Sequence, residues 1–458
     1  MAYQISDRAL NKFSELQSSR CSKAVASVIE DLIRNGSDFD CYKMNVFRVA
    51  ETYQLGQMET IQGFLYAARL GILDLNWDIH CASCKGIPEY HKHLMGLQNK
   101  AHCNLCSVDW ELSFEEQVEV SFTVNPDIRQ IDYPDWQDRD FNGKMQFLDD
   151  ILIREKRNFT VGTCIFGGKT TVVQGEFTPG EYYFYAPGFL EDAGKIIVSE
   201  NMATTPQVVR ISYDKNLQTD TKVLYLNAGT VEFQVTAAIE DMCGFLILPN
   251  RPTHNFVSAA YISGLQDFKD LFAGEFLRED VSFAIKNITL MFTDIKGSTA
   301  MYERLGDGPA YTLVQKHFDI MTEVIKEHNG GIVKTIGDAV MAAFSINSDA
   351  VKAALKLQKV FWDLSQTEDL KDVLVKIGLH RGPVIAVTSN RSLDYFGRTA
   401  NIAARVQSKA TEDEVLISDS VYSDPSVKDF IQTRGYHTKP RQELFKGIEG
   451  QFLVYSIH

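Results

Sequence analysis

The spacing of apolar residues changes along the chain, and each spacing predicts a different kind of element. From about residue 8 to 75, apolar side chains recur every three or four positions, which predicts helices with one buried face. Gly56 interrupts this pattern between two such stretches, 46–55 and 58–70. A helix, a glycine-containing turn and a second helix are typical of a winged helix, so we expect a helical domain of this kind near the start of the chain.

From about residue 112 to 250 the spacing shortens to two. Val118, Val120 and Phe122 alternate with polar residues, and comparable short runs follow, which predicts a sandwich or barrel of short strands. The segment Ser263–Glu279 returns to a helical spacing. It predicts an amphipathic helix that connects the β-rich region to the last part of the chain.

The last part of the chain follows a distinct order of strands and helices. Its apolar runs predict a strand, a long helix, a hairpin, a second helix and another strand, which is the βαββαβ order of a ferredoxin-like fold. Fold alone does not establish chemistry, because this architecture hosts many functions. The predicted elements span 288–294, 309–328, 331–344, 348–364 and 373–379, and the first helix is expected to turn Val314, Phe318, Met321 and Ile325 inward.

The composition is that of a folded protein with an acidic surface. The 458 residues are 45% hydrophobic and carry a net charge of −14, which disfavours nucleic acid or an anionic membrane as the main partner. Residues 1–75 contain eight Lys or Arg against nine Asp or Glu, so a structural or regulatory role is favoured over DNA reading, which stays open. No apolar run reaches the roughly 20 residues of a membrane helix, and no secretory pattern begins the chain, so we expect a cytoplasmic protein.

Two pairs of cysteines lie between the helical and the β-rich regions. Cys81 and Cys84 are followed, after eighteen residues, by Cys103 and Cys106, which is the spacing of a zinc ribbon. Four thiolates complete a tetrahedral site, so we expect a structural Zn²⁺ ion. A redox pair or a catalytic metal is the alternative, and one of the nearby histidines could replace a cysteine, namely His80, His91, His93 or His102.

The strand predicted at 288–294 ends in an acid that is followed by small residues. Asp294 is its last residue, and Gly297, Ser298 and Thr299 come soon after. Small residues let backbone N–H groups approach an anion closely, as they do at helix N-termini and in phosphate-binding turns. A metal ion and a phosphate could therefore meet at this strand end.

A second carboxylate occupies the turn of the predicted hairpin. Gly337 and Asp338 separate its two apolar runs, and an isolated Gly-Asp pair is most often only a turn. If the hairpin lies beside the first strand, Asp338 and Asp294 emerge at one edge of the sheet and can share hard cations through oxygen ligands. Two such ions could activate a hydroxyl and neutralise a triphosphate.

A turn that contains Asp394 leads into an Ala-rich helix with two polar residues. Asn401 and Arg405 are four residues apart, so they project from one face of that helix. An amide and a guanidinium in this arrangement can orient a ribose and stabilise charge on a transferring phosphoryl group. Taken alone, Arg405 would be interpreted as a surface or ion-pair arginine.

Together these segments resemble the signature motifs of the class III nucleotide cyclases. The resemblance covers about 285–458 and implies that a nucleoside triphosphate is converted to a 3′,5′-cyclic monophosphate and pyrophosphate. It also implies that two Mg²⁺ or Mn²⁺ ions act in each site and that two catalytic domains share the site. The matching segments are Phe292–Thr299, Lys334–Val340, and Asp394–Gly397 with Asn401 and Arg405.

The resemblance implies a role for each matching residue. The metal ligands would be Asp294, Asp338 and the backbone of Ile295. The residues that contact the nucleotide would be Lys334 and Asp394 at the base, and Gly297, Ser298, Thr299 and Lys446 at the phosphates. Asn401 would orient the ribose, and Arg405 would stabilise the transition state.

Base choice follows from hydrogen-bond polarity. Adenine presents an amine donor and a ring-nitrogen acceptor, which match Asp394 and Lys334, whereas family members that act on GTP typically carry Glu and Cys at these positions. ATP is therefore the expected substrate. A guanylyl cyclase and a catalytically weak nucleotide sensor are the alternatives. Because one domain carries every residue type, we expect a homodimer with two equivalent sites.

These observations predict a multidomain α+β protein whose N-terminal region regulates the dimer, through an unknown ligand or partner protein. The predicted parts are a winged-helix-like domain at 1–78, a zinc ribbon at 79–111, a β-rich, sandwich-like regulatory domain at 112–262, a connector helix at 263–284 and a cyclase domain with a ferredoxin-like fold at 285–458.

Overall fold

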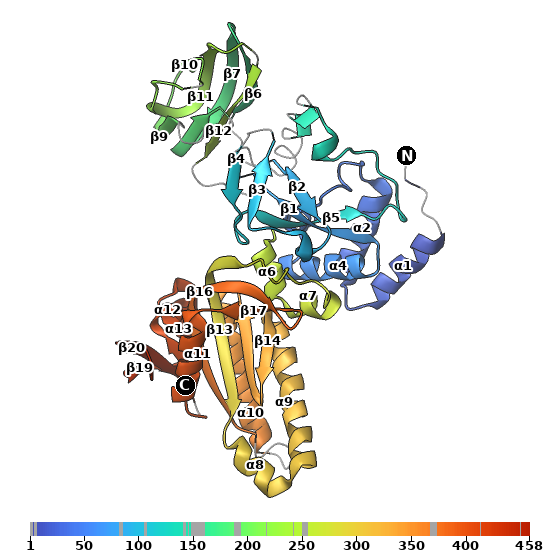
Figure 1. The fold of residues 1–458 in the computed structure, drawn as a ribbon, viewed down its shortest axis with the longest axis vertical. Coiled ribbons are helices and arrows are strands. Elements are labelled where there is room, and N and C mark those ends of the chain that lie inside the picture. Colours follow the sequence, from blue (N-terminus) through green and yellow to red (C-terminus); the bar gives the residue numbers. More distant parts are fainter. Residues whose placement is uncertain are drawn as a thin grey trace.

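The computed structural model shows an N-terminal part of helices with a small sheet, a separate β-rich part, and a C-terminal part built on a large sheet (Figure 1). No helix among the described residues is long and apolar enough to cross a bilayer. The structure describes residues 3, 7–81, 86–104, 108–140, 143–144, 146–147, 161–186, 194–216, 218–240, 242–249, 255–366, 373–412, 414–448 and 450–458.

The N-terminal part packs helices against a three-stranded sheet of order β2-β1-β5, and the two share one apolar core. Ser22 starts α2 because its side chain accepts a hydrogen bond from the backbone N–H of Val25, a donor that a helix start leaves unpaired. The helices predicted on either side of Gly56 are confirmed as α3 and α4, and the winged-helix interpretation stays a prediction. The elements are α1 (Asp7–Ser18), α2 (Lys23–Asn35), α3 (Val46–Thr52), α4 (Gln57–Arg69), β1 (Leu73–Ile79), β2 (Glu89–His91), β3 (Lys100–Cys103), β4 (Val108–Glu111) and β5 (Val118–Val124).

One strand belongs to a different part from the one that the sequence suggested. We predicted that β5 lies in the β-rich domain beginning at 112, but it pairs with β1 in antiparallel register over its full length. Almost all of β5 is buried, on both faces. Alternation of apolar and polar residues identifies a strand but not its partner, so the boundary at 112 is wrong for this strand.

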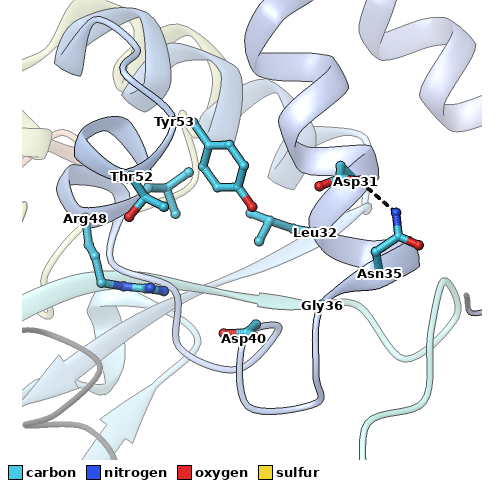
Figure 2. A pocket seen from close by; sticks show the side chains of 9 residues that line it. Asp31, Leu32, Asn35, Gly36, Asp40, Arg48, Thr52 and Tyr53 are labelled. Atoms are coloured by element: carbon cyan, nitrogen blue, oxygen red, sulfur yellow. Dashed lines mark hydrogen bonds between the residues drawn. The ribbon is translucent and has the colours of Figure 1, made fainter. Parts of the chain in front are cut away.

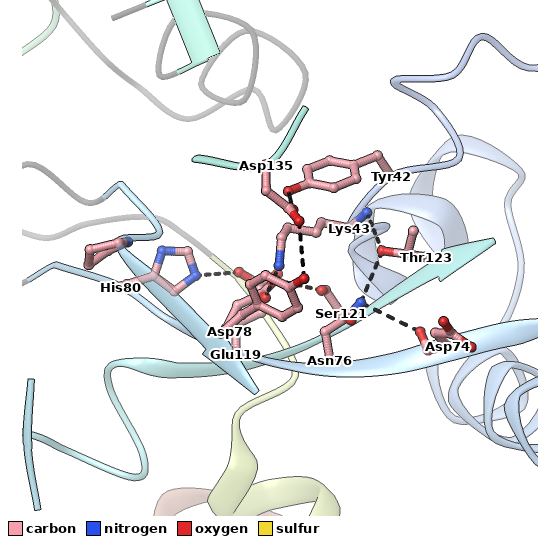
Figure 3. Close-up of polar contacts among 12 residues, drawn as sticks. Tyr42, Lys43, Asp74, Asn76, Asp78, His80, Glu119, Ser121, Thr123 and Asp135 are labelled. Atoms are coloured by element: carbon pink, nitrogen blue, oxygen red, sulfur yellow. Dashed lines mark hydrogen bonds and ion pairs between the residues drawn. The ribbon is translucent and has the colours of Figure 1, made fainter. Parts of the chain in front are cut away.

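The small sheet holds a buried ion pair and a buried histidine–carboxylate contact (Figure 3). Asp78 accepts hydrogen bonds from the Lys43 ammonium and from the Ser121 hydroxyl, the latter at 2.5 Å. His80 Nε2 lies 2.6 Å from a carboxylate oxygen of Glu119. Because an unpaired buried charge is strongly destabilising, this pairing allows the network to be buried. It joins β1 and β5 to the segment that precedes α3.

The middle part is a seven-stranded sheet, which confirms the predicted β-rich region. One long strand, β11, organises it, because its first half pairs with β9 and its second half with β10 and β7. Phe184, Phe233 and Phe245 lie in an apolar core that belongs to this part alone. The strands are β6 (Val161–Phe166), β7 (Thr170–Phe177), β8 (Gly180–Tyr185), β9 (Gly194–Met202), β10 (Gln207–Tyr213), β11 (Val223–Ala237) and β12 (Met242–Pro249).

The C-terminal part follows the predicted βαββαβ order and then extends it. Its eight-stranded sheet has the order β14-β15-β13-β16-β18-β20-β19, with β17 paired to β16. Helices α9 and α10 pack on one face, where they form a second core with β13, β15 and β16. The elements are β13 (Phe283–Ile295), α8 (Ser298–Leu305), α9 (Asp307–Glu327), β14 (Gly330–Ile336), β15 (Ala339–Phe344), α10 (Asn347–Ser365), β16 (Val375–Ser389), β17 (Ser392–Phe396), α11 (Arg398–Lys409), β18 (Val415–Ser418), α12 (Asp419–Tyr422), α13 (Pro425–Arg434), β19 (Thr438–Leu444) and β20 (Gln451–Ile457).

The buried face of α9 differs by one residue from the predicted one. Val314, Met321 and Ile325 are buried as expected, but Phe318 is only partly buried and His317 is fully buried. A histidine was not counted as apolar in the periodicity, although its position fits the helical spacing. Burial lowers the pKa of His317 to about 4, so its ring is neutral at neutral pH.

The connector consists of two short helices instead of the single helix predicted at 263–284. They are α6 (Ala259–Gly264) and α7 (Gln266–Leu271), and the extended backbone of Leu265 separates them. The Leu265 side chain enters the same core as the N-terminal helices and the sheet face opposite α9 and α10. Ile262 of α6 and Phe268 of α7 also belong to that core, and the apolar spacing alone cannot reveal the break between the two helices.

Candidate active site

Two carboxylates meet at one end of the large sheet. Asp294 lies one residue before the end of β13, and Asp338 follows Gly337 in the turn between β14 and β15. Strands β13 and β15 are paired, with Thr293 opposite Val340, so this turn lies beside the end of β13. The pKa of Asp294 is raised, first by burial and then by the negative charge of Asp338. The two predicted carboxylates are therefore close enough to influence one another.

The carboxylate pair has the properties of a cation site. Asp338 Oδ2 is buried and has no hydrogen-bond partner among the described residues, and two adjacent like charges are unfavourable without a counter-charge. Carboxylate oxygens are suitable ligands for Mg²⁺ or Mn²⁺. Within the described ranges no group of three or more His, Cys, Asp or Glu side chains could hold a metal. Further ligands would have to come from the backbone, such as that of Ile295, or from a substrate.

A helix begins directly beyond the first carboxylate. Gly297 precedes α8 with a φ of 68°, in the left-handed region that favours glycine, and Ser298 and Thr299 form the first turn. Backbone N–H groups at a helix start have no partner within the helix and attract anions. The three residues predicted to contact phosphate thus occupy a helix start beside Asp294.

The predicted base-recognition residues form a direct ion pair. Lys334 Nζ on β14 donates to Asp394 Oδ2 on β17 at 2.7 Å, although the residues are 60 positions apart in the chain. Asp394 is buried, and its Oδ1 accepts a hydrogen bond of 2.8 Å from the backbone N–H of Tyr395. The Lys334 ammonium also lies 5.2 Å from the centre of the Phe396 ring. The carboxylate is therefore held in place, while the ammonium retains N–H donors that Asp394 does not use.

Asn401 and Arg405 project from the outer face of α11. Both side chains are exposed. In the part of the chain that the structure describes, the Arg405 guanidinium has no hydrogen bond or ion pair. The opposite face of the helix is buried and holds Thr399, Ile402, Ala403 and Val406. This amphipathic helix keeps an arginine free to bind an anion.

Lys446 lies in the loop between β19 and β20. Its neighbour Phe445 is buried in a small core with Phe452, while Lys446 itself is exposed. The buried phenylalanine holds the loop, so the lysine is presented to solvent. The structure does not bring Lys446 into contact with the other predicted residues.

The predicted residues thus form separate groups within one molecule. Asp294 and Asp338 form one, Lys334 and Asp394 another, and α11 carries the third. Among the described residues, no hydrogen bond or ion pair joins one group to another.

Two polar residues beside the ion pair were not predicted. Lys269 Nζ of α7 donates to the carbonyl oxygen of Ile332 at 2.7 Å, and Gln266 Oε1 accepts from the N–H of Ile332 at 2.8 Å. Burial lowers the pKa of Lys269 to about 8, and the nearby charges of Asp394 and Asp270 oppose this effect. Helical spacing places residues on a face but does not show which strand they cover, so the sequence contains no pattern that identifies this pair.

The zinc ribbon stays a prediction. Cys81 and Cys103 are buried, and the Cys81 N–H donates to the carbonyl of Gly86. Cys84 and Cys106 lie outside the described residues. The alternative ligands are less favoured, since each nearby histidine lies within hydrogen-bond distance of a carboxylate: His80 with Glu119, His91 with Glu89, His93 with Glu275, and His102 with Asp109.

A cavity of about 240 Å³ lies in the N-terminal part (Figure 2). Asp31 and Asn35 of α2 are joined there by a hydrogen bond of 2.7 Å, and Arg48 and Tyr53 line the other side. None of the residues predicted for catalysis contributes to its lining. It is therefore separate from the candidate active site.

Comparison with known families assigns the C-terminal part to a class. Residues 281–458 match the family described as adenylate and guanylate cyclase catalytic domain. This part of the chain is a class III nucleotide cyclase domain, which confirms the resemblance in its motifs. Residues 6–143 match a family of unknown function, DUF5939.

Several relatives match part of this chain. The adenylate cyclase of Lachancea kluyveri is 28% identical over 205 residues, which are 40% of this chain and 11% of that protein. The adenylate cyclase of Anabaena cylindrica is 29% identical over 164 residues, 32% of this chain and 33% of that protein. The chain therefore spans a third or less of the length of these relatives. The crystal structure of the adenylyl cyclase CyaB from P. aeruginosa is 24% identical and covers 39% of this chain and 96% of that chain, with a TM-score of 0.34.

Proposed function

We propose that this protein is an adenylyl cyclase, a phosphorus–oxygen lyase that converts ATP to 3′,5′-cyclic AMP and pyrophosphate. The observation that carries this proposal is the Lys334–Asp394 ion pair on the sheet of a cyclase domain. Adenine donates from its exocyclic amine and accepts at a ring nitrogen. An Asp394 oxygen can accept the first hydrogen bond, and a remaining N–H of Lys334 can donate the second, without loss of the bond between them. The relatives named as adenylate cyclases support this choice.

The proposed reaction is an in-line displacement at the α-phosphorus. The ribose 3′-oxygen loses its proton to solvent and forms a bond to the α-phosphorus, while the bond to the departing pyrophosphate breaks. Mg²⁺ or Mn²⁺ held by Asp294, Asp338 and the Ile295 backbone would lower the pKa of the 3′-hydroxyl and neutralise the triphosphate. Asn401 orients the ribose, and Arg405 stabilises charge that develops as pyrophosphate leaves. Lys446 and the start of α8 bind the remaining phosphates.

We propose that two copies of the chain complete each site. Within one molecule, no described hydrogen bond or ion pair joins the two carboxylates to the Lys334–Asp394 ion pair or to α11. This separation supports the arrangement. In a twofold dimer, Asp294 and Asp338 of one molecule would face Lys334, Asp394 and Arg405 of the other. Two equivalent sites would result.

The other parts of the chain are proposed to regulate this reaction. A structural Zn²⁺ ion at Cys81, Cys84, Cys103 and Cys106 would hold the loops between β1 and β5. The N-terminal and middle parts would respond to a ligand or a partner protein, and the reaction would take place in the cytoplasm. The nearly equal numbers of basic and acidic residues in 1–75 give no support to nucleic acid as that partner.

The proposal predicts the products that the purified protein forms. Incubation with each of the four ribonucleoside triphosphates and Mg²⁺ or Mn²⁺ should yield cyclic AMP from ATP and at most traces of other cyclic nucleotides. Chromatography of the products distinguishes the alternatives. Cyclic GMP as the main product would identify a guanylyl cyclase, and tight nucleotide binding without any cyclic product would identify a sensor.

Base selectivity should follow the ion pair. In the double variant Lys334→Glu with Asp394→Cys, the donor and acceptor for adenine are replaced by groups that suit guanine. We expect the ratio of kcat/KM for ATP to that for GTP to fall by about a hundredfold or more, because the groups at these two positions no longer match adenine. Lys356→Glu, an exposed charge reversal on α10, is the matched control. An unchanged ratio in the double variant would separate this pair from base recognition.

A further inference from the structure

We infer that the connector positions the base-recognition pair, with Lys269 and Gln266 of α7 as positioning residues for the adenine site. This inference rests on the proposed function and adds residues that determine its specificity. It makes the selection of the base depend on a segment outside the cyclase domain. The contacts of three segments carry it: α7, the edge strand β14, and β17.

The first observation is an irregularity in β14 just before Lys334. Ile332 pairs with Ala342 and Lys334 with Met341, so Val333 has no partner and the register shifts at this point. A bulge of this kind re-aims the side chain that follows it. The direction of Lys334 therefore depends on how the backbone at Ile332 is held.

The second observation is that α7 holds this part of the backbone. β14 is the edge of the sheet, so its outward N–H and carbonyl groups have no neighbouring strand. Gln266 Oε1 accepts from the N–H of Ile332 at 2.8 Å, and Lys269 Nζ donates to its carbonyl at 2.7 Å. These two side chains thus act at the bulge in place of a partner strand.

The third observation is a close approach between the connector and β14. A Cβ atom placed on Gly331 would lie 2.3 Å from the carbonyl oxygen of Gly264 and 3.1 Å from the backbone nitrogen of Gln266. Only glycine fits at position 331 without a shift of the backbone. The joint between α6 and α7 is therefore fixed against the strand, and a movement of one is transmitted to the other.

The fourth observation connects Lys269 to the Lys334–Asp394 ion pair itself. Asp394 is the first of the two negative charges that act on the Lys269 ammonium, while it bonds directly to Lys334. Asp394 thus lies under the influence of two lysines from different elements. Loss of Lys269 would remove one positive charge beside Asp394 and would leave the carbonyl of Ile332 without its hydrogen bond. Both changes would alter the positions of the Lys334 and Asp394 side chains that contact adenine.

The connector is also attached to the N-terminal part. Asp267 of α7 accepts a hydrogen bond of 2.8 Å from Gln62 of α4. Phe268 packs edge-on against Trp77 of β1, with ring centres 5.8 Å apart. A displacement of α4 or β1 would therefore reach β14 through α7. A displacement in the N-terminal part can therefore be transmitted to the Lys334–Asp394 ion pair.

The test compares base selectivity in Lys269→Met and in a matched control. Methionine keeps the length of the side chain but loses the ammonium. We expect the ratio of kcat/KM for ATP to that for GTP to fall about tenfold, the scale of one lost charge-assisted hydrogen bond. The fall should come mainly from a higher KM for ATP, and Lys269→Arg should restore most of it. Equilibrium binding of fluorescent ATP and GTP analogues to the full chain should show the same change.

Lys12→Met is the control, since Lys12 Nζ also donates to a backbone carbonyl, that of Gly71, at 2.8 Å. It should leave the ratio unchanged. If Lys269→Met does not fold, Gln266→Leu carries the test, because it removes the bond to the Ile332 N–H and, besides it, only an exposed bond to Asp270. An equal loss for both nucleotides, or an unchanged ratio, would overturn the inference. The proposed function fails separately, if the wild-type protein itself forms no cyclic AMP.

Discussion

Replacement of Asp338 with alanine should lower the turnover of ATP by about three orders of magnitude or more, or roughly 4 kcal/mol of activation free energy. The reason is that Asp294 alone cannot hold cations against a triphosphate as the pair would. The stability of the folded protein should not fall, because Asp338 Oδ2 has no hydrogen-bond partner among the described residues and its charge raises the pKa of Asp294. Removal of the charge relieves this repulsion.

Two measurements check this expectation together. Initial rates of cyclic AMP formation give the loss of activity, and thermal unfolding should give a Tm equal to or above that of the wild type. Asp363→Ala, which removes an exposed carboxylate from α10, should retain full activity. Near-normal turnover in Asp338→Ala would exclude Asp338 from the metal site. A large drop in Tm would instead mean that the carboxylate has a structural role.

The second large effect should appear when two inactive variants are mixed. Asp338→Ala damages the carboxylate side of a site, and Arg405→Ala damages the α11 side. In a heterodimer of the two, one site combines both lesions and the other has none. Random pairing of equal amounts makes half of the dimers mixed, each with one intact site. Activity should therefore return to about a quarter of the wild-type value per chain.

A pair of lesions on the same side provides the control. Asp294→Ala mixed with Asp338→Ala leaves every site without a complete carboxylate pair, so no activity should return. Different affinity tags on the two chains would establish that mixed dimers form. Mixed dimers without recovery for Asp338→Ala with Arg405→Ala would contradict the shared site, and substantial activity of either variant alone would contradict the role of its residue.

The catalytic part could be predicted in detail from the sequence because its local signals agree. Period-two and period-3.6 spacing, the Gly337–Asp338 turn and a strand ending at Asp294 specify elements whose order allows only a few topologies. The contact between Lys334 and Asp394 follows from the family resemblance, since nothing in the local pattern brings residues so far apart together. His317 was missed because its polar ring occupies a position that packing, not polarity, decides.

The N-terminal region was predicted less well, because the sequence pattern identifies an element but not the elements that it contacts. β5 has the spacing of a strand in the β-rich part, yet its neighbour in space is β1. The connector has the apolar spacing of one helix, yet Leu265 breaks it to enter the shared core. Gln266 and Lys269 matter through hydrogen bonds to Ile332, which is far from them in the chain. Contacts of this kind depend on tertiary packing, which single-sequence patterns do not encode.

The core that runs without interruption from the first helices to the large sheet limits how the chain can be divided. Ile288 and Leu290 of β13 and Tyr395 of β17 belong to the same apolar cluster as Phe64 of α4 and Phe268 of α7. A shortened chain that begins just before β13 would expose this apolar sheet face to solvent. Such a face tends to bind itself or other surfaces. Kinetics recorded on the excised domain would then describe an assembly that the intact polypeptide never forms.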